Sequence, residues 1–81
     1  MDAKQYLKQL AETHQKNRPV MEFIGLILLA ANDYVELSAK QEEFLSQLLL
    51  PENLHARRDH WHAMQIAVFI NTCAPPMKPI S

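Results

Sequence analysis

The sequence predicts an all-α protein, in which one small four-helix domain is followed by an extended, proline-rich C-terminal tail. Three observations support this fold class. The 81 residues include a single glycine and no run of alternating β-branched residues, so strands are not indicated. Apolar residues recur at three- and four-residue spacing along most of the chain. The prolines stand where helices can begin or end, because a proline is tolerated in the first turn of a helix but breaks its interior.

The predicted helices cover about residues 2–16, 19–35, 39–50 and 52–73. They form one predicted domain, residues 1–74, and residues 75–81 form the tail. A chain of this length supports one domain at most, and a domain of this size is only marginally stable alone.

The first two predicted helices differ in their apolar pattern. The helix at 2–16 carries one apolar stripe, which consists of Ala3, Tyr6, Leu7, Leu10 and Ala11. The helix at 19–35 is apolar almost all round, which predicts burial on every side. Gly25 in its middle predicts the close approach of another helix over a surface that lacks a Cβ atom. The apolar run, residues 20–31, is too short to span a bilayer, which takes about 20 residues, so no membrane partner is expected.

The third and fourth predicted helices have clear boundaries. Ser38 and Gln41 form a capping-box pattern at the start of the helix at 39–50. The inner face of that helix is predicted to hold Phe44, Leu45, Leu48 and Leu49. The helix at 52–73 is polar in its first half and apolar in its second, and it ends before Pro75.

Cysteine usage and the N-terminal segment indicate a cytoplasmic location. Cys73 is the only cysteine, so no disulfide can form within one chain, and this suits a reducing compartment. Residues 1–16 are polar and contain no apolar stretch of the kind found in a signal peptide.

A polar cluster in the fourth predicted helix suggests two kinds of site. His55, Asp59 and His62 would share one face of a continuous helix, and two imidazoles with a carboxylate are a low-probability metal site. The segment from Arg57 through Arg58 to Trp61 combines cationic donors with a stacking ring, as nucleic-acid-binding surfaces do. Two arginines are few for phosphate-driven binding, and the formal net charge is -1, so a nucleic-acid partner is disfavoured.

The sequence contains no identifiable catalytic set and no glycine-rich phosphate loop, so no enzymatic activity and no cofactor are expected. The excess of apolar helix surface favours a non-enzymatic regulator, adaptor or inhibitor that binds another protein and forms a homodimer. The helix at 52–73 is the expected dimer surface, and the helix at 19–35 is a second candidate for it. The residues expected to bind the partner are Arg57, Arg58, Trp61, Met64 and Val68. The alternatives are a dimeric nucleic-acid-binding regulator that uses residues 57–61, and a metal-binding module that uses His55, Asp59 and His62. The stretch PENLHARRDHWH resembles small bacterial or phage-encoded helical regulators in general character, without matching a defined motif.

Overall fold

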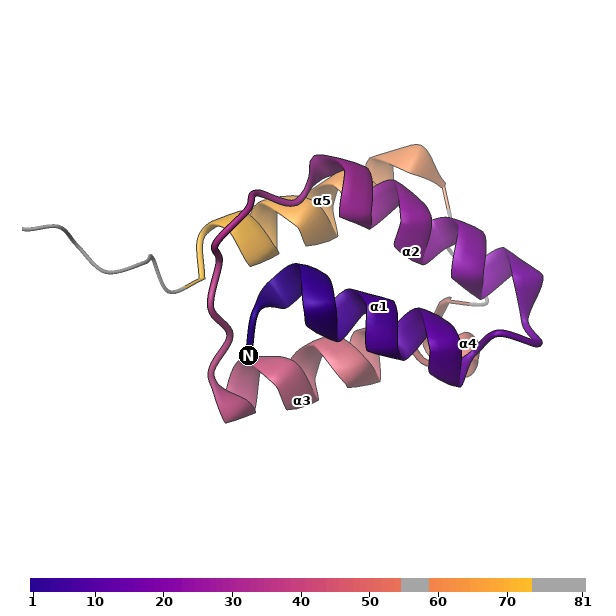
Figure 1. Ribbon diagram of the computed structural model, residues 1–81. Coiled ribbons are helices and arrows are strands. Elements are labelled where there is room, and N and C mark those ends of the chain that lie inside the picture. Colours follow the sequence, from indigo (N-terminus) through magenta and orange to yellow (C-terminus); the bar gives the residue numbers. More distant parts are fainter. Residues whose placement is uncertain (55–58, 74–81) are drawn as a thin grey trace, which may run out of the picture.

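The computed structural model of the protein describes residues 1–54 and 59–73, and these residues confirm the all-α prediction (Figure 1). Within the described residues the helices are α1 (Ala3–Thr13), α2 (Arg18–Ala30), α3 (Ala39–Leu48), α4 (Pro51–Leu54) and α5 (His60–Asn71). The described residues form no β-strand. One isolated antiparallel bridge joins Asp2 and Glu36. The predicted tail, residues 75–81, lies outside the described residues.

Side-chain caps begin three of the helices where the sequence predicts a start. The Asp2 carboxylate accepts a hydrogen bond at the start of α1, and the Asn17 side chain does so at the start of α2, with Pro19 in the first turn. The predicted capping box of α3 is confirmed. The Gln41 amide donates to Ser38 Oγ at 3.2 Å, and the Ser38 amide donates to Gln41 Oε1 at 2.8 Å. These caps satisfy amides that have no partner inside a helix.

The helix predicted at 19–35 ends earlier, because α2 stops at Ala30 and Ala31 is already extended, with φ -76° and ψ 139°. Tyr34 adopts a left-handed φ of 68°, which is incompatible with a continuing right-handed helix. The segment that follows runs antiparallel to the N-terminus. The Ala3 amide donates to the Val35 carbonyl at 2.8 Å, and the Leu37 amide donates to the Met1 carbonyl at 2.9 Å.

The prediction of one continuous helix at 52–73 was wrong. Helix α4 ends at Leu54 and α5 begins at His60, with Asp59 in an extended conformation (φ -83°, ψ 169°) that no α-helical residue has. Residues 55–58 lie outside the described residues. Helix α4 is tied to the end of α3, since the Asn53 side chain donates a hydrogen bond to the Gln47 carbonyl.

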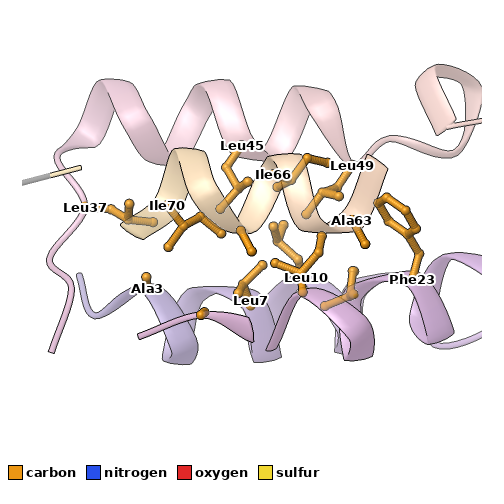
Figure 2. Close-up of a cluster of buried hydrophobic side chains, with 14 of the residues drawn as sticks. Ala3, Leu7, Leu10, Phe23, Leu37, Leu45, Leu49, Ala63, Ile66 and Ile70 are labelled. Atoms are coloured by element: carbon orange, nitrogen blue, oxygen red, sulfur yellow. The ribbon is translucent and has the colours of Figure 1, made fainter. Parts of the chain in front are cut away.

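The core lies between two helix pairs. Helices α2 and α5 run side by side in one layer, and α1 and α3 lie across from them (Figure 1). Figure 2 shows the labelled apolar side chains converging from α1, α2, α3, α5 and the loop before α3. The fully buried large side chains are Leu7, Val20, Phe23, Ile24, Ile27, Leu45, Leu49, Leu54 and Ile70. No polar or charged residue is fully buried in the described part of the chain.

Helix α2 is buried on one face only, so the prediction of burial on every side was wrong. Leu29 is 85% exposed and Met21 is 37% exposed. A Cβ atom built on Gly25 would meet nothing within 4 Å, which contradicts the predicted close approach of another helix within the chain. The outer face of α2 therefore combines exposed apolar side chains with a partly buried glycine that has open space for a Cβ atom among the described residues.

Asn71 joins the C-terminal ends of α2 and α5. Its Nδ2 donates to the Ala30 carbonyl at 3.1 Å, and its Oδ1 accepts from the Asn32 amide at 2.7 Å. We expect Asn71→Asp to lower the free energy of unfolding by about 1–3 kcal/mol, because a carboxylate cannot donate to the Ala30 carbonyl at the negative end of a helix. Urea titration followed by circular dichroism measures this change.

Gln65→Glu is the matched control for Asn71→Asp, since it also converts an amide to a carboxylate on α5 but at an exposed position. Its effect should stay within about 0.5 kcal/mol. Equal losses in the two variants would show that the bridge to Ala30 does not hold the helices together.

Candidate functional site

The outer face of α5 is the candidate binding surface. Trp61 and Val68 are 64% and 61% exposed, and they lie in one stripe with the exposed Gln65 and Thr72. This spacing of three and four residues places the stripe on one side of the helix. The opposite side carries the buried residues Ala63, Ile66, Ala67 and Ile70.

The predicted partner-binding residues are therefore divided between different environments. Trp61 and Val68 lie on the exposed stripe, whereas Met64 is partly buried and packs against the core. Arg57 and Arg58 lie outside the described residues. The structure thus places one exposed indole ring and one exposed β-branched side chain about two turns apart on α5.

The layer formed by α2 and α5 is almost uncharged. The sequence of α5 contains no Asp, Glu, Lys or Arg. In α2 the only such residues are Arg18 and Glu22, which pair with each other at 3.2 Å. The remaining charges of the described residues lie on α1, α3, α4, the connecting segments and Asp59. A neutral, partly apolar face of this kind favours a partner surface that is also neutral.

Phe44 extends the apolar surface from α5 to α3, which the sequence did not predict. It was expected on the inner face of its helix, but it is 51% exposed. Its ring meets the ring of Phe69 edge-on, with centroids 5.2 Å apart and planes at 62°. The pair lies at the border between α3 and α5, so aromatic surface continues across that border.

The suggested metal site assumed that its three residues lie on one continuous helix, and the structure does not have that helix. His55 lies outside the described residues, and Asp59 is extended rather than helical, so the predicted shared helical face is lost. His62 packs its ring against Phe23 with centroids 5.5 Å apart, and its Nδ1 atom is buried without a hydrogen-bond partner. Within residues 1–54 and 59–73, no three His, Cys, Asp or Glu side chains lie close enough to hold a metal ion. His62 therefore acts as a packing residue of the core edge.

Two basic side chains of the described region form ion pairs. Lys4 pairs with Asp33 at 2.9 Å, and Arg18 pairs with Glu22. Phosphate binding requires several basic groups gathered on one surface. The described geometry adds no support to the nucleic-acid alternative, and its arginines at 57 and 58 lie outside the described residues.

Cys73 is a packed thiol at the end of α5. It is buried, and its Sγ donates a hydrogen bond to the Phe69 carbonyl at 3.2 Å. Burial raises the pKa of the Cys73 thiol above its ordinary value. Because the thiolate is the reactive form of cysteine, this environment lowers the nucleophilicity of Cys73 near neutral pH.

The ammonium group of Met1 ties the N-terminus to the start of α3. It lies 3.2 Å from both the Glu36 and the Glu42 carboxylates, and it donates to the Leu37 carbonyl at 2.9 Å. These contacts, first with Glu36 and then with Glu42, raise the pKa of the Met1 ammonium above 8.0. The charged cluster thereby connects α1, the segment before α3 and α3 itself.

In a chain that begins at Met1, stability should fall as the pH rises above about 8. The ammonium pKa is raised in the folded state, so its contribution is fully present below the unfolded value of 8.0. It is lost as the pH rises through the raised folded value. Thermal unfolding midpoints between pH 7 and pH 9 measure this decline, a range set by the ordinary pKa values of an α-amino group and a thiol.

The double variant Glu36→Gln/Glu42→Gln should have a flatter stability profile over that range, because it removes both carboxylates that hold the proton. Glu43→Gln controls for the loss of a nearby negative charge and should keep the decline. A Cys73→Ala background removes the second group whose raised pKa acts in the same direction at higher pH. An unchanged decline in the double variant would show that the Met1 cluster does not contribute.

Each helix in the described part is too short or too polar to cross a lipid bilayer. No known protein family, curated protein sequence or solved structure matches this chain.

Proposed function

We propose that this chain is a non-enzymatic interaction protein, a small regulator, adaptor or inhibitor, which binds another protein on the outer face of α5 and associates with itself. The observation that carries the proposal is the exposure of Trp61 and Val68 on a helix that contains no Asp, Glu, Lys or Arg.

Burial of this surface by a partner would be energetically favourable. Tryptophan is enriched at binding hot spots, since its large ring can be fully desolvated in a pocket. Burying an exposed valine contributes about 1.5–3 kcal/mol by transfer from water. The half-exposed Phe44 lies beside Phe69 of α5 and would widen the contact. The partner that fits is a surface with an apolar pocket for the indole ring and few charges around it.

Affinity purification with matched variants tests this proposal. The wild-type chain, Trp61→Ser/Val68→Ser and the control Gln65→Ser are used as baits in the native host, and co-purifying proteins are identified by mass spectrometry. A true partner should be retained by wild type and by Gln65→Ser and lost from the double variant. Because all three positions are exposed, circular dichroism should show the same fold for every bait.

Titration of each variant with the purified partner then measures how much the substitution weakens binding. Trp61→Ser should weaken binding by a factor of about 30 or more, as expected for a hot-spot residue that contributes at least 2 kcal/mol. A partner that binds the double variant as tightly as wild type would overturn the assignment of the α5 face.

Self-association is tested separately by size-exclusion chromatography with light scattering over a wide concentration range. The apparent mass should rise from the monomer toward the dimer as concentration increases. A monomer mass at every concentration would overturn this part of the proposal and leave partner binding unaffected.

A further inference from the structure

We propose that a second copy of this chain docks on the outer face of α2, with the two α2 helices antiparallel and crossing at Gly25. The inference rests on the self-association proposed above and gives it a location. It also leaves the α5 face, with Trp61, free for another protein.

The outer face of α2 is symmetric about Gly25. Met21 and Leu29 lie four residues before and four residues after the glycine, so all three residues follow one ridge of the helix. A two-fold axis through Gly25 places Leu29 of each copy against Met21 of the other. Leu29, at 85% exposed, is thereby covered by a side chain that is itself partly exposed.

The packing of Gly25 among the described residues does not require a glycine. A glycine in an exposed helix interior destabilises the helix by about 1 kcal/mol relative to alanine. Apart from its own helix, no described part of the chain lies within 4 Å of the position where its Cβ would be, so no contact among the described residues requires the glycine. At a helix crossing the missing Cβ allows two backbones to approach closely, which gives this residue a role between copies.

The charges on α2 also suit an antiparallel pair. Arg18 is the first residue of α2, where a cation is disfavoured by the positive end of the helix dipole, and the last turn carries no basic residue. In the antiparallel pair Arg18 of each copy lies beside the C-terminal end of the other α2, where exposed carbonyls favour a cation. Because Glu22 already balances Arg18 within each copy, two identical faces meet without net repulsion.

The size of this interface indicates a weak dimer. Helix α2 has 13 residues, which corresponds to a length of about 20 Å at 1.5 Å per residue. A single pair of such helices buries less than the roughly 800 Å² per partner that is typical of a stable complex. The dimer should therefore dissociate on dilution, and trapping it covalently gives the clearest readout.

Cysteine cross-linking tests the crossing point. In a Cys73→Ala background, Gly25→Cys places a thiol on the proposed two-fold axis, and mild oxidation should give a disulfide-linked dimer. Gln65→Cys, on the exposed face of α5, is the matched control and should give much less. The Gly25→Cys chain should fold, because the monomer has open space at this position.

Two further variants test the same position. Gly25→Leu is measured by sedimentation equilibrium, and Gly25→Ala by thermal unfolding. Gly25→Leu should raise the dimer dissociation constant at least about tenfold by separating the two backbones, which corresponds to 1.4 kcal/mol. Gly25→Ala should raise the melting midpoint of the dilute monomer through its higher helix propensity, showing that the position itself tolerates a side chain. The emission of Trp61 should not shift as wild type dimerises, since the α5 face stays exposed.

Three outcomes would overturn the inference. Efficient cross-linking at position 65 with none at position 25 would assign the dimer to α5, as would a blue shift of Trp61 emission on dimerisation. If the dimer dissociation constant of Gly25→Leu equals that of wild type, the two α2 helices do not cross at Gly25. The proposed self-association would stand. A wild-type monomer at all concentrations would remove both self-association and its location, while the test of partner binding through Trp61 would stand independently.

Discussion

Replacing Phe23 by alanine is expected to lower the free energy of unfolding by about 3–5 kcal/mol. Phe23 is only 2% exposed and lies in the core (Figure 2). Its ring packs against His62 with centroids 5.5 Å apart. Its loss removes apolar contacts and leaves a cavity beside the ring of His62. A domain of 81 residues has a total stability of roughly 4–12 kcal/mol at typical values per residue. The substitution therefore removes a large share of the total stability and should shift the unfolding midpoint to a much lower urea concentration.

Urea unfolding followed by circular dichroism checks this result, and Phe44→Ala is its control. The control removes the same side chain from a half-exposed position where the main contact is the edge of the Phe69 ring. It should lower stability by about 0.5–1.5 kcal/mol, the usual value of an aromatic pair. Equal losses in both variants would contradict the assignment of Phe23 to the core and Phe44 to the surface.

Local signals in the sequence predicted most of the fold. The capping box of Ser38 and Gln41 acts within four residues, so its pattern identifies the start of α3 without knowledge of the rest of the chain. Asn17 and Pro19 mark the start of α2 for the same reason. The apolar stripe of α1 likewise predicted the buried residues Ala3, Leu7 and Leu10, whereas Tyr6 and Ala11 of the same stripe are only partly buried.

Features that depend on distant contacts were not predictable from sequence pattern. The end of α2 is fixed by Asn71, which comes 39 positions after Asn32 and has no local signature there. The break before α5 lies in a polar stretch where no apolar period distinguishes a helix from a turn, and only the extended conformation of Asp59 reveals it.

The candidate site was predictable in part. The apolar pattern predicted that some helix surface of one chain stays uncovered, and Trp61 and Val68 lie on one helix as predicted. Their part in partner binding stays a prediction. Which face of α2 points outward depends on how the helices pack, so the exposure of Leu29 and the open side of Gly25 could not be inferred. Phe44 was assigned to the core together with its apolar neighbour Leu45. The packing of α3 buries Leu45 and leaves Phe44 exposed, and the sequence does not show which of the two faces inward.

Leu45 holds α3 in the bundle, and Leu45→Ala is expected to lower the free energy of unfolding by about 2–5 kcal/mol. It is the only residue within α3 that is fully buried, and its side chain points into the core (Figure 2). The other described links of this helix to α1 and α5 are weaker. They include a hydrogen bond from the Tyr6 hydroxyl to the Glu42 carbonyl at 2.9 Å, the ion pair of the Met1 ammonium with Glu42 at 3.2 Å and the edge contact of Phe44 with Phe69. Loss of the leucine should therefore release α3 before the rest of the domain unfolds.

Amide hydrogen exchange distinguishes this local release from global unfolding. In Leu45→Ala the amides of α3 should lose more protection than those of α2 and α5, which pack closely against each other. Leu48→Ala is the control, because it deletes the same atoms from the same helix at a partly buried position. It should have a smaller effect on stability and on the α3 amides, since less apolar area is exposed to water and a smaller cavity remains. Equal loss of α3 protection in both variants would show that the helix is held by its whole apolar side rather than by Leu45.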